Sequence, residues 1–357
     1  MTEECLKLSA YFGERQRFRH RFVADALLDL FGRHEVATSI LLRGVEGFGL
    51  KHHLRTDSSL TLSEDLPVVA LAVDRRSEIE EVRDEATAIV GSGLLTLERA
   101  RLQDSELPGG PLEGLTGPAK LTIYLGRDER IYRVPAFVAV CDLLRRRDVA
   151  GATALVGVDG TMHGDRERAR FFSRNADVPM MVIAVGSAEQ IGRLLPELGA
   201  LLRRPLLTVE RIHLCKRDGV LLSAPHPLPA RDERGLAIWQ KLMIYTSEAS
   251  THAGHPIHRA ITRALRGAGA AGSTTLRGVW GFHGDHEPHG DRPLQLGRRV
   301  PTVTTVIDTP ERISAWFPIV DELTAERGLV TSEMVPALHV RASEHQRGGL
   351  RLARHRF

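Results

Sequence analysis

The chain has 357 residues and a formal net charge of +3 at pH 7. That length allows two or three domains, and so small a charge does not indicate nucleic-acid binding. Three scattered cysteines without a CxxC pair exclude a disulfide framework. The sequence has no signal-peptide core and no apolar run near the roughly 20 residues of a membrane span, so we expect a soluble, cytoplasmic protein.

The first 103 residues carry a succession of six predicted elements. The first is an alternating apolar run that contains Tyr11, which is typical of a half-buried strand. Two apolar stripes at helical spacing and three further strands follow, and Pro67 opens the third strand, where a missing N–H is tolerated. In chain order the elements are strand, helix, strand, strand, helix and strand, at 6–13, 23–31, 36–49, 67–74, 79–89 and 95–98.

The same succession occurs twice more, over 119–217 and 238–342. The matched lysines and glycines keep constant offsets of 113 and 234 positions from the first copy: Lys7, Gly44 and Gly47, then Lys120, Gly157 and Gly160, then Lys241, Gly278 and Gly281. Each copy also ends in a variant of L-T-x-E, with Glu98, Glu210 and Glu333. Capping-box sequences predict the starts of two helices, at Ser77-x-x-Glu80 and Ser187-x-x-Gln190.

Each copy therefore predicts a β-α-β-β-α-β unit, an α+β fold of the ferredoxin-like type with both helices on one face of a four-stranded antiparallel sheet. The other sheet face is apolar and must be covered, so we expect the three copies to close as a ring. Two linkers rich in proline and glycine, 104–118 and 218–237, join the copies. A basic tail, 343–357, is expected to be a solvated end or a docking segment for an acidic partner.

The second strand of each copy ends in a glycine turn, R-G-x-x-G in copies one and three. Such a turn lets a ligand approach the backbone, its N–H groups can bind an anion, and a neighbouring arginine adds donors matched to phosphate. The alternative is that the glycines only shape a strand bend. The candidate ligand-binding residues are Arg43, Gly44, Gly47 and Phe48, then Gly157 and Gly160, then Arg277, Gly278, Gly281 and Phe282.

Copy two departs from this pattern. Val156 stands at the position of the arginine, and Thr161 at that of Phe48 and Phe282. At least one of the three clefts between copies is therefore expected to be altered. Division of labour among the copies and decay under a structural role are both open explanations.

Loops are predicted after these turns, at 50–60, 161–174 and 283–296. The third contains His283, His286 and His289 beside carboxylates, and these side chains suit a divalent transition metal such as zinc, copper or nickel. Copies one and two offer only His52, His53 and His163 in their loops. A solvated polar loop is the alternative, because Pro288 and the glycines oppose a helix that would align the imidazoles.

The motifs of enzymes and RNA-binding sheets are missing from the sequence. It has no GxSxG, Walker loop, HExxH or helix-opening GxGxxG, so we expect no enzymatic activity. RNA binding on a sheet needs stacked aromatic side chains with basic neighbours. The first strands offer one tyrosine each, Tyr11, Tyr124 and Tyr245, and we expect these to pack between the copies.

The motifs LLRGVEGFG, LSEDLPVV and TTLRGVWGF resemble the PII-like family known as domain of unknown function 190, and the resemblance covers all three copies. Its relatives include the PII signalling proteins and the metal-linked CutA proteins. The resemblance implies an intramolecular PII-like pseudo-trimer, monomeric in solution, that binds a nucleotide or another small anionic ligand between copies. It also implies mobile loops that report to a regulated partner such as a membrane transporter or an enzyme, with a CutA-type metal-binding protein as the alternative.

Overall fold

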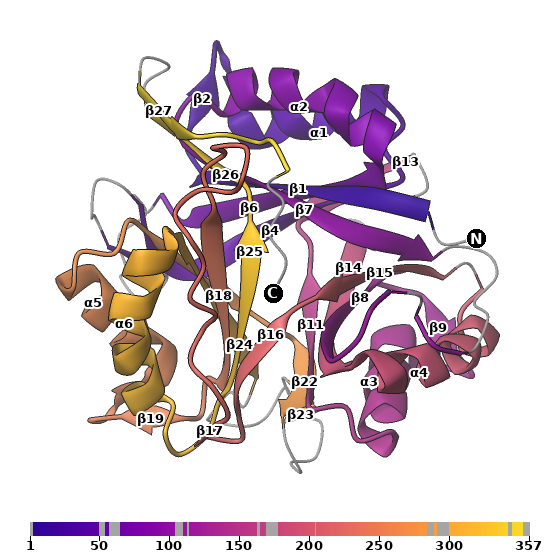
Figure 1. The fold of residues 1–357 in the computed structure, drawn as a ribbon. Helices are drawn as coiled ribbons and strands as arrows, with labels where there is room; N and C mark the ends of the chain where they lie inside the picture. Colours follow the sequence, from indigo (N-terminus) through magenta and orange to yellow (C-terminus); the bar gives the residue numbers. More distant parts are fainter. Residues whose placement is uncertain are drawn as a thin grey trace.

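The computed structural model describes residues 3–49, 54–56, 65–103, 110–112, 114–162, 165–168, 178–203, 205–283, 289–290, 300–341 and 345–352. Three pairs of helices lie on the outside of the molecule and the strands lie between them (Figure 1). Each pair belongs to one of three consecutive units, which we call copy one (1–103), copy two (119–217) and copy three (238–342). Within the described ranges, no helix is both long enough and apolar enough to cross a membrane.

The predicted order of elements is confirmed in each copy. Copy one comprises β1 Glu3–Gly13, α1 Val23–Arg33, β4 Thr38–Phe48, β6 Pro67–Arg75, α2 Arg76–Val90 and β7 Gly93–Gln103. Copy two comprises β8 Pro118–Gly126, α3 Ala136–Arg146, β11 Gly151–Val156, β12 Asp159–Met162, β14 Pro179–Ser187, α4 Ala188–Leu201 and β15 Leu206–Arg211. Copy three comprises β18 Trp239–Ser247, α5 Ile257–Gly267, β21 Ser273–Arg277, β22 Trp280–His283, β24 Pro301–Asp308, α6 Pro310–Leu323 and β25 Leu329–Val335.

The fold also contains short strands that were not predicted from the sequence. Each copy has a two-stranded hairpin between its first strand and its first helix: β2 Arg17–Phe18 with β3 Arg21–Phe22, β9 Arg130–Ile131 with β10 Val134–Pro135, and β19 Thr251–His252 with β20 His255–Pro256. The others are β5 Arg55–Thr56, β13 Asp165–Arg168, β16 His213–Arg217, β17 Val220–Leu221, β23 His289–Gly290, β26 Ala337–Arg341 and β27 His345–Gly348. Thr161 and Met162, expected to open a loop, belong to β12 instead.

Each copy forms one antiparallel four-stranded sheet. In copy one the strand order is β4, β6, β1, β7, and copies two and three repeat it with β11, β14, β8, β15 and β21, β24, β18, β25. The prolines predicted to open the third strands do so at Pro67, Pro179 and Pro301. The capping box is confirmed at Ser187 and Gln190, but the one predicted at Ser77 is wrong, because α2 already begins at Arg76.

The apolar faces that the helices leave bare pack against one another at the centre. A buried cluster there draws on all three copies, with Ile40, Leu71, Leu155, Ile183, Met243 and Val303 among its members. Tyr124 and Tyr245 lie in it and Tyr11 packs against it, which confirms the prediction that these tyrosines pack between copies. Burial of these faces is the main hydrophobic gain from joining three copies.

Neighbouring copies are joined by strand pairing that runs around the ring. The end of β4 pairs with β21 of copy three, β12 pairs with the start of β4, and β22 pairs with β11. A second set runs in the opposite direction, where β7 pairs with β15, β16 with β25, and β26 with β7. Each pair of copies is therefore held by two backbone ladders.

The glycines of the turns lie where these ladders cross between copies. A Cβ at Gly47, Gly160 or Gly281 would overlap a backbone carbonyl oxygen of the next copy, that of Ser273, Ser39 or Ala152. A glycine is required there because a neighbouring backbone approaches too closely for any side chain. The glycines thus have a structural role in joining the copies.

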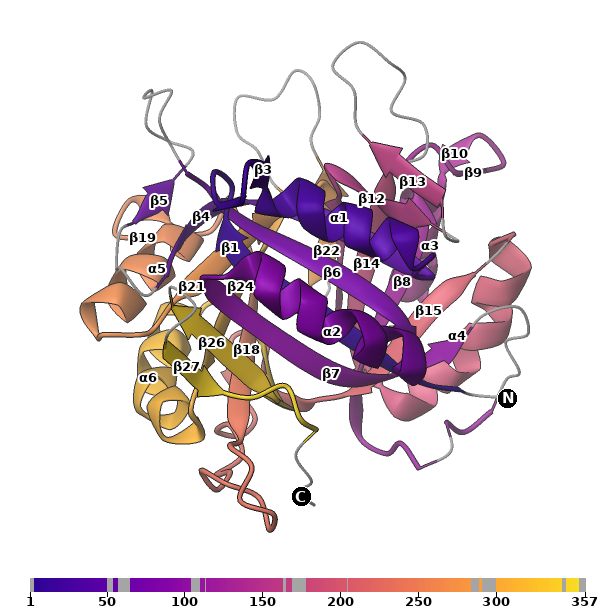
Figure 2. The same ribbon diagram turned by 90° about the horizontal axis from the view of Figure 1, so that it is seen from above.

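The expectation of a frayed C-terminal tail is wrong for residues 345–352, although Gln346, Arg347 and Gly348 are exposed as expected. Strand β27 pairs with β26 to form a hairpin that continues copy three beside β7 of copy one (Figure 2). Leu350 is buried in the core of copy one, together with Leu338 and Val340 of the hairpin. This C-terminal hairpin, 337–348, thus fastens copy three to copy one.

The close approach at the glycines yields a test on stability. We expect Gly160→Ala to lower the free energy of unfolding by about 2 kcal/mol, because the new methyl group must push two copies apart. Gly32→Ala is the matched control, since Gly32 lies in α1 with no atom within 4 Å of an added Cβ. It should raise stability by up to about 1 kcal/mol. Equal urea midpoints for the two variants would contradict the role given to Gly160.

Candidate functional site

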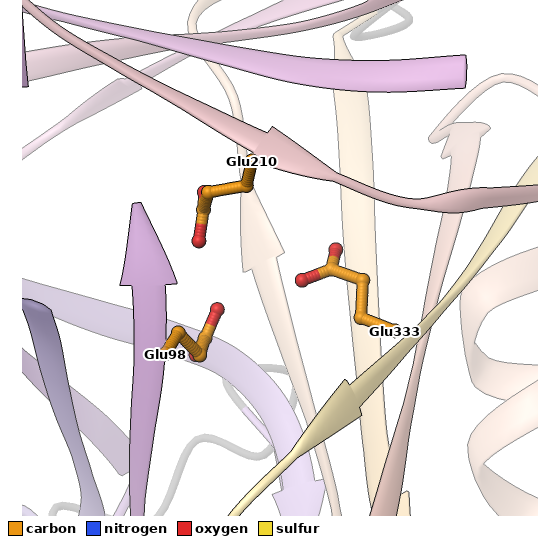
Figure 3. A group of neighbouring side chains, drawn as sticks. All are labelled: Glu98, Glu210 and Glu333. Carbon is orange, nitrogen blue, oxygen red and sulfur yellow. The ribbon is translucent and has the colours of Figure 1, made fainter. Parts of the chain in front are cut away.

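The first strands and the closing strands bring six charged side chains together at the centre. Three carboxylates point toward one another from three different strands (Figure 3). Each lysine contacts the glutamate of its own copy and that of another: Lys7 contacts Glu98 at 2.9 Å and Glu210 at 2.5 Å, Lys120 contacts Glu210 at 3.2 Å and Glu333 at 2.7 Å, and Lys241 contacts Glu333 at 2.9 Å and Glu98 at 2.6 Å. We call these six residues the ionic ring.

Burial and mutual attraction act against each other in the ionic ring. Burial disfavours the charged form of Lys7, but Glu210 and Glu98 hold its pKa well above its usual value. Burial likewise favours a neutral Glu98, but Lys241 and Lys7 keep the pKa of Glu98 well below its usual value. At Lys120 burial prevails and lowers the pKa. With three charges of each sign, the ring is neutral as a whole.

The three glutamates also form the one cluster of metal-ligating side chains found in the described part of the chain. Their carboxylate oxygens lie within 4.8 Å of one another. Three ammonium groups already occupy the space that a cation would need, and a cation there would be repelled by them. The arrangement is therefore a structural junction of ion pairs, and it does not favour a metal centre.

The predicted arginines of the turns are paired within their own copies. Arg43 contacts Glu14 at 2.8 Å, and Arg277 contacts Glu248, the matched position of copy three, at 2.7 Å. In copy two both members of the pair differ, since Arg127 and Val156 stand at these two positions. The loss of the arginine in copy two therefore accompanies the loss of its carboxylate partner.

The predicted phenylalanines reach into the neighbouring copy. Phe48 is buried in the core of copy three, and Phe282 is buried in the core of copy two. At the matched position Thr161 bonds to copy one, with its hydroxyl 2.9 Å from that of Ser39 and its carbonyl accepting from Thr38. Phe48, Phe282 and Thr161 therefore each join two neighbouring copies.

A cleft of about 380 Å³ lies between copies one and three. Copy one contributes the end of β1, Phe48, Arg55 and Asp65, and copy three contributes Ser273, Thr274, Thr305 and His339. Among the predicted ligand-binding residues Phe48 lines it, whereas Arg43, Gly44 and Gly47 lie beside it in β4. We call it the one–three cleft.

The entrance of the one–three cleft carries two arginines and one acid. Asp65 accepts from Arg55 at 2.8 Å and from the backbone N–H of Arg15 at 2.7 Å. Two arginines, Arg15 and Arg55, line the cleft beside one acid, Asp65, which is an excess of cationic over acidic residues. That excess suits an anionic group.

A second hollow, of about 470 Å³, lies between copies two and three. It is lined by charged side chains around Phe282: Asp142, Arg145, Arg146, Asp148 and Arg217. Burial raises the pKa of Asp142 against the pull of Arg146 and Arg145. Most of the lining residues are charged, and Arg217 contacts Asp218 at 3.3 Å, so this hollow has less apolar wall than the one–three cleft.

The histidine loop of copy three lies largely outside the described residues. His286 is not described, nor are His52, His53 and His163 of the other loops. His283 ends β22, and the backbone of His289 pairs with Gly281. A metal site at these histidines therefore stays a prediction.

Comparisons with known proteins agree with the repeat. A family model described as "Uncharacterized ACR" matches the chain three times, at residues 5–102, 118–214 and 239–337. The UPF0166 protein of Aquifex aeolicus (strain VF5) is 27% identical over 100 residues, which are 28% of this chain and 92% of that protein. It thus has about the length of one copy.

One solved structure aligns with almost the whole chain. It is an aspartate kinase from Synechocystis, aligned over 95% of this chain and 46% of its own at 12% identity, with a TM-score of 0.26. The chain thus spans about half the length of that protein. A likeness this low supports no statement about fold or activity here.

In the sequence the ring residues stand out only as markers of the repeat, and their contact was not predicted. The signal was present, because a lysine or a glutamate recurring at one position in three apolar strands needs a buried partner of opposite charge. The positions of Arg15, Arg55 and His339 in the one–three cleft were not predicted either. These residues occupy loops or short strands outside any motif, and only the fold brings them together.

Removal of one charge from the ionic ring should be costly. We expect Lys241→Met to lower the free energy of unfolding by about 3–5 kcal/mol, because Glu98 and Glu333 are left buried without it. Arg193→Ala, which removes an exposed ion pair with Glu189, is the control and should cost at most about 1 kcal/mol. Similar losses for the two variants in urea unfolding would contradict the account of the ring.

The ring also predicts a dependence of stability on pH. The pKa of Glu98 lies below its usual 4.5, so its contribution is complete above pH 4.5 and is lost as the pH falls through the folded-state value. The pKa of Lys7 lies above its usual 10.5, so its contribution is complete below pH 10.5 and is lost at higher pH. In the Lys241→Met variant, protonation of the glutamates removes the unpaired negative charge. The difference in free energy of unfolding between this variant and the wild type should therefore become smaller between pH 7 and pH 4.5. A gap that widens on acidification would be inconsistent with the ring.

Proposed function

Because the chain belongs to the family of domain of unknown function 190, in three copies, we propose that it is a PII-like sensor for a nucleotide or another small anionic ligand. In this proposal the three ferredoxin-like copies act as an intramolecular pseudo-trimer, and the protein is monomeric, cytoplasmic and without enzymatic activity. The ligand binds in the one–three cleft. Because the three copies differ in the residues at their clefts, one cleft of the three binds the ligand in this proposal.

The observation that supports this proposal most is the composition of the one–three cleft. Its inner wall is largely apolar, with Tyr11, Leu94 and Ile307, and its entrance has Arg15 and Arg55. A pocket with an apolar body and a few convergent polar groups is the usual form of a small-ligand site. An apolar inner wall with a cationic entrance suits a molecule that joins a ring to an anionic group.

The same residues connect the cleft to the loop of copy one. Arg55 and Asp65 contact each other at 2.8 Å and stand on either side of residues 57–64 in the chain. An anion that binds Arg55 competes with Asp65 for it. Ligand binding would thereby alter the base of the loop that reports to a partner, such as a membrane transporter or an enzyme.

Two substitutions at the ion pair should change affinity in opposite directions. We expect Arg55→Ala to weaken binding of AMP, ADP or ATP at least tenfold, since it removes a donor and leaves the charge of Asp65 facing the ligand. Asp65→Asn should strengthen binding, because Arg55 is released while the amide oxygen still accepts from the N–H of Arg15. Isothermal titration calorimetry on the full chain measures both.

Arg43→Ala is the control for that experiment. Arg43 forms a similar exposed ion pair, with Glu14, but does not line the cleft. Its loss should leave nucleotide affinity unchanged. The proposed function fails if no nucleotide binds the wild type at millimolar concentration, or if Arg43→Ala weakens binding as much as Arg55→Ala does.

A further inference from the structure

The C-terminal hairpin adds a histidine to the one–three cleft that no turn motif contains. His339 lies on β26, opposite Leu94 of β7, and lines the cleft. Its neighbours Leu338 and Val340 are buried in the core of copy one, so alternation along the strand turns His339 to the other face. There its ring stacks on Trp239, with ring centres 5.0 Å apart.

Both ring nitrogens of His339 are buried and have no hydrogen-bond partner among the described residues. A buried polar group without a partner destabilises a fold by about 1–3 kcal/mol, so such groups usually have a use. An imidazole that lines a cleft with both of its nitrogens in this state points to a ligand that supplies the missing bonds.

The imidazole of His339 is neutral at physiological pH. Burial lowers its pKa to about 4, helped by Arg347 and opposed by Asp308. A neutral imidazole presents one N–H donor and one bare nitrogen acceptor. It therefore suits a ring with donors and acceptors along its edge better than it suits an anion.

His339 and the arginines stand at separate ends of the cleft. Leu94 pairs with both His339 and Tyr11, and Gly13, two residues beyond Tyr11, lies beside Arg55 and Asp65. Two strand spacings of about 4.8 Å and two residues of about 3.4 Å separate the ends by roughly 12 Å. A free phosphate cannot contact both ends, whereas a mononucleotide spans such a length.

We propose that His339 recognises the nucleobase of the ligand, whose phosphate lies at Arg15 and Arg55. Nucleobase edges carry the donors and acceptors that a neutral imidazole can meet. This inference rests on the proposed function and deepens it, since it limits the ligand to anions that carry a hydrogen-bonding ring. It also makes the site specific to the one–three cleft, because His339 comes from the C-terminal hairpin, whereas the matching hairpin of copy two, β16 with β17, pairs with copy three.

The test compares His339→Phe with the wild type in calorimetric titrations with AMP, GMP, CMP and UMP, and with ribose 5-phosphate. Phenylalanine keeps the stacking on Trp239 but has no hydrogen-bonding atom. We expect at least a tenfold loss of affinity for the mononucleotide that binds the wild type best, with unchanged affinity for ribose 5-phosphate. His339→Gln, which restores one donor and one acceptor, should regain part of the loss.

Thermal melting separates recognition from a structural role. His339→Phe should melt at the same temperature as the ligand-free wild type or higher, because it removes two buried polar atoms without partners. His213→Phe is the matched control, since His213 stacks on His226 and its Nε2 contacts Ser223 at 2.8 Å. That variant should melt lower and bind as the wild type does.

The outcomes distinguish this inference from the function on which it rests. Equal mononucleotide affinity in the wild type and His339→Phe overturns the role of His339 and leaves the one–three cleft as an anion site. Equal losses for mononucleotide and ribose 5-phosphate overturn the role as well, because the ring would then not be what His339 contacts. If no mononucleotide binds the wild type, the inference and the proposed function both fail.

Discussion

The ionic ring is the constraint on which the remainder of the structure depends. Every lysine of the ring contacts glutamates of two copies, so no copy can leave without exposing a buried unpaired charge to the apolar centre. The ring thereby sets the register of the first and closing strands, and these carry the backbone ladders between copies. An apolar junction could be as stable, but it would specify the register less strictly.

The ionic ring has the same residue types in all three copies. The copies differ instead in the residues at the outer junctions between them. Copy two has lost both members of the pair seen as Glu14 with Arg43, and Thr161 closes its junction with copy one. Copies two and three both continue into a hairpin, and that of copy three places His339 beside copy one. A single chain can vary one cleft at a time, whereas an assembly of identical subunits must change all of its clefts together.

Much of the fold could be predicted from the sequence, because the repeat displays each element three times. Strand starts at Pro67, Pro179 and Pro301 and the burial of the tyrosines followed from local pattern. The site could not be predicted in the same way. The turn glycines proved to accommodate backbone approach between copies, which depends on tertiary pairing, and Arg15, Arg55, Asp65 and His339 are far apart in the chain. The tail looked solvated from its arginines, although Leu350 anchors it in a core.

The central claim is that one chain of three copies has one ligand cleft, between copies one and three. A crystal structure of the full chain grown with AMP tests this most directly. We expect electron density for one nucleotide, with its phosphate at Arg15 and Arg55 and its base at His339, and none at the other two junctions. Nucleotide bound equally at all three junctions, or only in the hollow beside Phe282, would contradict it.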